Sequence, residues 1–275
     1  MLPLLKRRML ILLNQIKTEF NAILTIAFRD ITKLLRDRVR LISGLVFPVI
    51  FIGVLGGSLQ ANVGSQLGFN FLVFVFTGVF IQSLFQSTAS GVIFLLEDRN
   101  SDFSQELFVA PVSPRSIIFG KILGESMVAL TNAFGILVFG LLVGVSFTFW
   151  QAISLIAMAI AGCLLGGAFG IIVLSNLSED RTVRQIFPFL IFPQIFLAGV
   201  FAPLKEVPTV LFILSKIIPL TYVVDFGRGL YYWGTDTYDQ VVLLHPLVNL
   251  AVILAMFLVF LFVGTWLFVR KERDR

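Results

Sequence analysis

The sequence predicts an all-α integral membrane protein with six transmembrane helices, and three observations lead to this class. Hydrophobic residues make up 57% of the 275 residues and charged residues only 13%, whereas a soluble domain carries about 25% charged residues. Six segments offer runs of apolar residues near the ~20 that a helix needs to cross a bilayer. Lysine and arginine are unevenly distributed between these segments. This composition excludes a soluble enzyme, a disordered tail and a nucleic-acid-binding module.

Residues 1–40 predict a cytoplasmic amphipathic helix that lies in the membrane interface. Within 16–36, apolar residues recur at steps of three or four, and basic residues occupy much of the remaining face. This periodicity is typical of a helix with one apolar side lying on a membrane surface. The apolar positions are Ile16, Phe20, Ile23, Ala27, Ile31 and Leu34.

Residues 41–275 form the predicted transmembrane domain. The six predicted spans are at about 41–60, 69–96, 117–146, 150–174, 186–202 and 247–269. The region 203–233 is also apolar, but Pro203, Pro208 and Pro219 interrupt it, and proline breaks a helix. We therefore expect extracytoplasmic re-entrant helices between spans five and six, where protein or water shields the broken backbone.

The distribution of positive charge predicts the orientation of the chain. Nine of the 21 Lys and Arg residues lie in the first 40 residues, whereas only Lys205, Lys216 and Arg228 fall on the opposite side of the predicted bilayer. Cytoplasmic segments of membrane proteins carry an excess of Lys and Arg. Both termini are therefore expected in the cytoplasm.

The loop between the second and third spans has two interpretations. Its first part is a short amphipathic pattern, which Pro111 and Pro114 end. Such a helix could be a docking element for a cytoplasmic partner, or the loop could be an ordinary solvated turn. The residues that a docking element would use are Glu97, Asp98, Arg99, Phe103, Glu106 and Leu107.

Polar and small residues recur at helical spacing inside two of the spans. Gln82, Gln86 and Ser90 form one polar stripe along the second span, which either bonds to a neighbouring helix or lines a translocation path. Small residues four apart let helix backbones approach closely. The small-residue positions are Gly162, Gly166 and Gly170 in the fourth span and Gly140 and Gly144 in the third.

The sequence predicts no catalytic residue and no metal site. His245 is the only histidine, and the chain contains no G-x-x-x-x-G-K-[ST] string for nucleotide phosphates. Glu125 lies inside a span, four residues after Lys121, and the two could be a functional pair or a purely interfacial one. Asp225 and Arg228 are three residues apart, so we expect them to pair and brace the re-entrant hairpin, with substrate binding as the alternative.

Two runs of residues before the last predicted span resemble the signature of type-2 ATP-binding-cassette exporter permeases, and both belong to the extracytoplasmic side of the predicted domain. The first family motif is F-x-G-x-F-x-P-L-x-x-x-P and the second is P-L-T-Y-x-x-D-x-x-R; here Ala198 intervenes before the glycine of the first. The loop around Glu97 also resembles the coupling segment of that family. The matching residues are Gly199, Phe201, Pro203, Leu204, Pro208, Pro219, Leu220, Tyr222, Asp225 and Arg228.

The resemblance implies the membrane subunit of an exporter. Two copies, or one copy and a paralogue, would pair with two cytoplasmic ATPase subunits, which would carry ATP and Mg, so no cofactor is expected on this chain. The ATPases would push on the 97–108 segment, and the signature residues would form an outer gate or brace. The P-L-T-Y form resembles the drug and lipophile branch, which implies an amphipathic or lipid-like cargo: a drug, lipid or glycolipid.

Other classes of membrane protein remain open from the residues alone. A secondary carrier or channel would usually show ionisable residues at mid-depth or inverted repeats, and neither is evident. An intramembrane enzyme would need histidines, paired carboxylates or paired cysteines that the spans lack. A membrane scaffold without transport activity is the last alternative.

Overall fold

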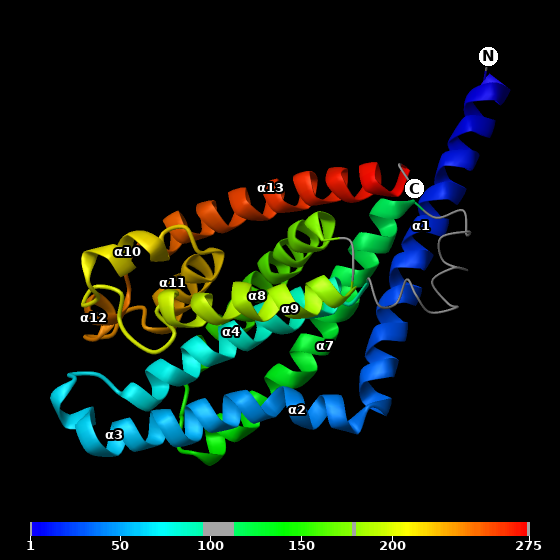
Figure 1. Cartoon of the computed structure of the whole chain (residues 1–275). Coiled ribbons are helices and arrows are strands. Elements are labelled where there is room, and N and C mark those ends of the chain that lie inside the picture. The colour runs from blue at the N-terminus through cyan, green and yellow to red at the C-terminus, as the bar shows by residue number, and fades with distance from the viewer. Residues whose placement is uncertain (1, 96–112, 178–179, 274–275) are drawn as a thin grey trace.

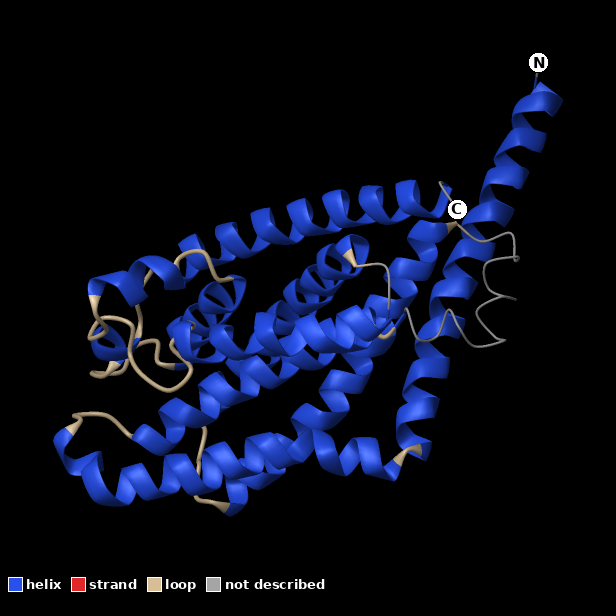
Figure 2. Ribbon diagram, viewed as in Figure 1, coloured by secondary structure: helices blue, strands red, loops and turns tan. Residues whose placement is uncertain are grey.

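A computed structural model describes residues 2–95, 113–177 and 180–273. Every regular element among these residues is a helix, and Figure 2 shows only helices joined by loops. By length and composition, five described helices could cross a membrane, or six if one bent pair counts as a single span. The predicted all-α membrane class is therefore confirmed.

The first helix, α1 (Leu2–Arg36), lies across one end of the bundle (Figure 1). The chain then turns sharply at Asp37, whose side chain accepts a hydrogen bond from the backbone N–H of Arg40 and caps α2 (Arg38–Val49). A π-helical stretch, η1 (Ile50–Gly56), and α3 (Gly57–Val63) continue α2 along the bundle. Together they form the first apolar helix, Arg38–Asn62.

Three long helices form the centre of the bundle, and α4 (Phe71–Ile93) contributes most of its buried aromatic residues. It packs against α7 (Pro114–Leu142) and α8 (Phe149–Asn176). Side chains cap all three helix starts: Asn70 for α4, Ser113 for α7, and a Thr148–Gln151 capping box for α8. The last helix, α13 (Pro246–Arg273), packs along α8.

Three shorter helices gather at the end of the bundle opposite α1 (Figure 1): α10 (Thr209–Ser215), α11 (Pro219–Tyr231) and α12 (Tyr238–Val241). The helix α9 (Asp180–Leu197) runs along the bundle toward them. The α10 and α11 helices meet at 92°, as a broken span or a re-entrant pair. Of the predicted fifth span, 186–202, only residues 186–197 are helical, and they belong to α9, whose apolar part Gln185–Leu197 is shorter than the candidate spans. The chain turns at Gly199, where φ is +76°.

The glycines of α8 face the backbone of α4. A Cβ at Gly170 would lie 2.7 Å from the carbonyl oxygen of Ala89, and one at Gly166 would collide with the carbonyl of Phe85. The proposed third-span repeat is wrong, because α7 ends at Leu142 and Gly144 lies in the following turn. Its φ is +94°, and a Cβ there would meet nothing within 4 Å. Gly144 is therefore needed for the backbone conformation of the turn and not for helix packing.

The face of α1 that packs on α7 differs from the predicted stripe. Ala27 and Leu34 are buried as expected, but so are Ile26 and Asp30, which the stripe did not include. Phe20 is 58% exposed, although it lies seven residues before Ala27 and so on nearly the same face of the helix. The contact with α7 therefore does not cover Phe20, and the predicted contact of the stripe with the membrane interface stays a prediction.

Candidate functional site

Buried charges join three helices at the end of the bundle where α1 lies. Lys121 Nζ on α7 is 3.1 Å from Asp30 Oδ2 on α1 and 2.8 Å from Glu125 Oε1. Glu125 Oε2 is 3.2 Å from an Nη of Arg40 on α2, and Asp30 Oδ1 is 2.7 Å from Arg29. We call these five residues the charge cluster. Asp30, Lys121 and Glu125 are at most 3% exposed, so each buried carboxylate is compensated by two cations.

Glycines on neighbouring helices make room for the charge cluster. A Cβ at Gly124 would lie 3.0 Å from Asp30 Oδ2 and 3.0 Å from the Cα of Ala27, and a Cβ at Gly91 would overlap the carboxylate of Glu125. Gly120 approaches α1 in the same way, with a Cβ position 3.1 Å from Ile26. The Gly120-xxx-Gly124 spacing was therefore a sequence signal for this contact, and our sequence interpretation missed it.

Glu19 joins α1 to the first residue before α7. Its carboxylate accepts hydrogen bonds from the backbone N–H of Ser113, at 3.1 Å, and from the Ser113 hydroxyl, at 3.0 Å. The hydroxyl of Ser116 and the two groups of Ser113 lower the pKa of Glu19, although partial burial raises it. The carboxylate therefore holds α1 at the point where the 97–112 loop ends.

The predicted docking residues lie outside the described residues. Both interpretations of that loop, a docking element and a solvated turn, therefore stay predictions from the sequence. The residues concerned are Glu97, Asp98, Arg99, Phe103, Glu106 and Leu107.

A pocket of about 450 Å³ opens between α2, α4, α7 and α9. Its polar lining comes from Arg40, Ser43, Ser83, Gln86, Ser87, Ser90 and Asn132. Its aromatic lining comes from Phe47, Phe94, Phe187 and Phe192. The pocket therefore offers hydrogen-bonding groups and apolar surface side by side.

The polar stripe of α4 divides between this pocket and the helix interior. Gln86 and Ser90 line the pocket, whereas Gln82 does not and is only 1% exposed. The side-chain amide of Gln82 donates a hydrogen bond to Oε1 of Gln86. Within the described residues, the Oε1 of Gln82 and the hydroxyl of Ser83 are buried without a hydrogen-bond partner. The two glutamines thus act as a unit, with Gln86 reaching the pocket.

Arg228 on α11 is buried and holds three segments together. Its Nη1 donates to the carbonyl of Gly199 at 2.6 Å, and its Nη2 donates to Val200 at 3.0 Å and Phe74 at 3.2 Å. The guanidinium also lies over the ring of Phe74, 3.5 Å from its centroid. The expected pairing with Asp225 is wrong, because the arginine binds carbonyl groups of the α9–α10 connection and the start of α4 instead.

Asp225 makes a separate set of hydrogen bonds, to the segment between α12 and α13 and to α13 itself. Its carboxylate accepts hydrogen bonds from the backbone N–H groups of Leu243, at 2.7 Å, and Leu244, at 2.8 Å, and from the side-chain amide of Asn249, at 2.7 Å. Backbone groups outside regular helices need such partners when they are buried. The two charged residues therefore brace the hairpin separately, each through backbone atoms.

The other signature residues shape the same end of the bundle. Gly199 has φ +76°, and a Cβ there would lie 2.8 Å from Cγ of Leu204. Phe201 stacks on Phe51 of η1, with ring centroids 4.9 Å apart. Pro203 is buried. This part of the first motif therefore forms a tight turn packed against the first apolar helix.

The second motif starts α11. Pro208 precedes α10 as its cap residue, and Pro219 is the first residue of α11, where its missing N–H costs no helical bond. Leu220 is buried in the core. The hydroxyl of Tyr222 donates to the carbonyl of Lys216 at 2.7 Å. These contacts fix the bend between α10 and α11.

Residues 21–232 match the family model of the ABC-2 type transporter. The match covers more than half of the chain. This chain belongs to that family. The matched range takes in the turn at Gly199 and the bent pair of α10 and α11.

Relatives agree with this assignment. The chain is 27% identical over 203 residues to a protein of Cyanophora paradoxa named as transport permease ycf38, covering 72% of this chain and 70% of the relative. It is 25% identical over 260 residues to the inner membrane transport permease YadH of Escherichia coli K12, covering 92% of this chain and 96% of the relative. The chain is a multi-pass membrane subunit for transport, of a family that associates with ABC ATPases.

Proposed function

We propose that this chain is the permease of an ATP-driven exporter that moves an amphipathic or lipid-like molecule, such as a drug, lipid or glycolipid, out of the cytoplasm. Two copies, or one copy and a paralogue, would assemble with two cytoplasmic ATPase subunits. Those subunits would bind ATP and Mg. Both termini would face the cytoplasm, and the membrane would be the plasma or inner membrane; the E. coli relative is named as an inner membrane transport permease.

The observation that carries this proposal is the double attachment of α1 to α7 directly after the 97–112 loop. The Glu19 carboxylate accepts a hydrogen bond from the backbone N–H of Ser113, directly before α7. Further along α7, Lys121 forms an ion pair with Asp30 of α1 in the charge cluster. A push on the loop would therefore reach α1 and α7 together. Because Arg40 of α2 also joins the charge cluster, the same push would reach the first apolar helix.

The mixed lining of the 450 Å³ pocket supports an amphipathic cargo. Hydrophobic and aromatic walls with a few polar groups are typical of small-molecule sites. Gln86, Ser90 and Asn132 could bond a polar headgroup, while Phe47 and Phe192 could contact its apolar part. The pocket borders α2 and Arg40, so movement of the charge cluster would change its shape.

A co-purification experiment tests the coupling. The tagged chain is extracted from its native host in a mild detergent, and the eluate is assayed for ATP hydrolysis and for a P-loop protein. We expect the wild type to bring down an ATPase, and the E106K variant to lose most of it while inserting normally. The matched control is E206K, because Glu206 is exposed at the opposite end of the bundle and should keep the ATPase.

Two results would contradict the proposal. Equal recovery of ATPase with E106K and the wild type would remove the docking role of the loop. Uphill transport by the chain alone in liposomes, driven by a proton gradient without any ATPase, would instead establish a secondary carrier.

A further inference from the structure

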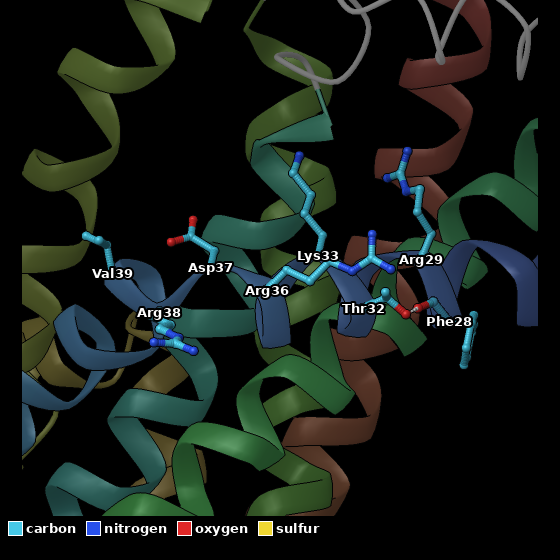
Figure 3. Close-up of a pocket in the computed structure, with 8 residues that line it drawn as sticks. All are labelled: Phe28, Arg29, Thr32, Lys33, Arg36, Asp37, Arg38 and Val39. Atoms are coloured by element: carbon cyan, nitrogen blue, oxygen red, sulfur yellow. Dashed lines mark hydrogen bonds between the residues drawn. The ribbon is translucent and has the colours of Figure 1, made fainter.

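A positively charged groove lies at the elbow between α1 and α2 (Figure 3). Its volume is about 790 Å³. Four cationic side chains line it, Arg29, Lys33, Arg36 and Arg38, together with one carboxylate, Asp37. We call it the elbow groove. It is separate from the polar pocket, with which it shares no lining residue.

Little of the positive charge in the elbow groove is compensated by its own carboxylate. The Asp37 side chain is engaged as the cap of α2, where it accepts from the N–H of Arg40 at 3.0 Å. Arg29 is paired with Asp30. Arg36 and Arg38 are exposed, and within the described part of the chain no side-chain hydrogen bond or ion pair is found for either. The groove therefore presents at least two arginine forks to an outside anion.

Apolar side chains border these cations. Phe28 and Val39 line the same groove and are 72% and 77% exposed. In the view of Figure 3 they lie at opposite ends of the row of side chains, with the cationic residues between them. Leu35 and Ile42 are 58% and 68% exposed nearby in the sequence. Exposure of this much apolar surface to water is unfavourable, whereas the same surface is stabilised at the interface of a bilayer.

We propose that the elbow groove binds an anionic phospholipid, with the phosphate at one of its exposed arginine side chains, Arg36 or Arg38, and the acyl chains against the apolar ends at Phe28 and Val39. Guanidinium groups bind phosphate through paired hydrogen bonds, and basic pockets at the membrane surface hold anionic lipid headgroups. The apolar ends of the groove favour a lipid over a soluble phosphate compound. This assignment is independent of the transported cargo and of the ATPase.

Binding of short-chain lipids to the purified full-length chain tests the proposal. The probes are dioctanoyl phosphatidylglycerol, dioctanoyl phosphatidylcholine and glycerol phosphate, titrated in a nonionic detergent with thermophoresis as the readout. The test variant is R36Q/R38Q. The matched control is K17Q/R115Q, which removes two exposed charges outside the groove. Monodisperse elution and an unchanged melting temperature verify that both variants fold.

We expect the wild type to bind phosphatidylglycerol at least tenfold more tightly than phosphatidylcholine. Each basic residue near a membrane surface contributes about 1 kcal/mol to the binding of anionic lipid, so R36Q/R38Q should bind phosphatidylglycerol roughly thirtyfold more weakly. The single variants R36Q and R38Q should each lose about fivefold by the same reasoning. K17Q/R115Q should change the affinity by less than about threefold, because those side chains lie outside the groove.

Three results would overturn the proposal. The first is equal binding of the two lipids by the wild type. The second is an equal loss in R36Q/R38Q and K17Q/R115Q, which would mean that only the net charge of the protein matters. The third is displacement of phosphatidylglycerol by glycerol phosphate at the same concentration, which would assign the groove to a soluble phosphate compound.

Discussion

Gly199 and Gly234 both adopt a left-handed backbone, with φ of +76° and +74°, but only the first is crowded. A Cβ at Gly199 would lie 2.8 Å from Leu204, whereas a Cβ at Gly234 would meet nothing within 4 Å. Side chains other than glycine strain the backbone at positive φ by about 1–2 kcal/mol. The pair therefore separates backbone strain from steric collision within one protein.

We predict that G199A destabilises the protein more than G234A does. Both variants carry the backbone strain, about 1 kcal/mol, and G199A adds the displacement of Leu204, about 1–3 kcal/mol by analogy with overpacked cores. Melting temperatures in detergent measure the difference. Equal melting temperatures for the two variants would show that the turn absorbs the added methyl group.

At the same scale, the hydrogen-bond partners of Arg228 could not be predicted from the residues next to it in the sequence. The spacing of Asp225 and Arg228 allows an ion pair, yet the arginine binds Gly199, Val200 and Phe74. The carbonyl groups of Gly199 and Val200 lie in a turn outside the helices, and a guanidinium with five donors can bind them together with the carbonyl of Phe74 in α4. A sequence pattern identifies the pair of charges but not the acceptors, which are distant in the chain.

At the scale of helices, the charge cluster joins α1, α2 and α7. Removal of Lys121 breaks two buried ion pairs and leaves Asp30 and Glu125 with one cation each. Breaking a buried pair typically costs about 3–5 kcal/mol, whereas replacement of both partners by neutral groups is often nearly neutral. The cluster should therefore respond very differently to one substitution and to three.

We predict that K121M lowers the stability by about 3–5 kcal/mol, because Asp30 and Glu125 lose their shared cation. The triple variant D30N/K121M/E125Q should recover most of that loss. K216M is the control, since Lys216 is exposed. Melting temperatures of the four proteins give the comparison, and a triple variant less stable than K121M would argue against a charge effect.

The contact between Glu19 and Ser113 predicts a dependence on pH. Hydrogen bonds lower the pKa of Glu19 in the folded protein, below a value of about 4.3 for an unfolded glutamate. The bound carboxylate therefore stabilises the α1–α7 contact fully above the unfolded pKa. This stabilisation is lost as the pH falls through the folded pKa.

The measurement is the melting temperature of the wild type minus that of E19Q between pH 3 and pH 7. We expect a positive difference at pH 7 that shrinks as the pH falls below about 4. S116A keeps the carboxylate but removes its main donor, so its pH-dependent loss of stability should be smaller and should be complete at a higher pH than in the wild type. A difference that stays constant down to pH 3 would rule out the contact as the cause.

At the scale of the whole molecule, α1 lies at one end of the bundle and the α10–α12 elements at the other (Figure 1). The positive-inside rule assigns the α1 end to the cytoplasm. The only cysteine, Cys163, is buried, so the C163A variant gives a cysteine-free background. Single cysteines introduced at exposed positions then report on which side of the membrane each end of the bundle lies.

We predict that D236C reacts with a membrane-impermeant maleimide in intact cells, and that K17C reacts only after permeabilisation. Asp236 lies beside α12 and Lys17 lies on α1, and both residues are exposed. The opposite pattern would invert the topology and place the docking loop outside. Expression of both variants is checked after solubilisation.

Much of the fold could be predicted from the sequence, because its signals are local. Apolar segments, prolines and the distribution of charge can each be recognised within a window of about 20 residues, the length of one span. Together they predicted an all-α membrane protein with a broken helical region before the last helix. The polar stripe and Lys121 with Glu125 were likewise identifiable, since residues four apart share a helix face. The docking loop stays a prediction.

By itself, the sequence determined the class of protein and the motifs of its family. Only the tertiary structure decided that Asp30 reaches Lys121, that Arg228 binds the turn at Gly199, and that Gln86 lines a pocket while Gln82 is buried. Periodicity gives the face on which a residue lies, whereas its partner depends on which helices pack together and how closely their glycines let them approach.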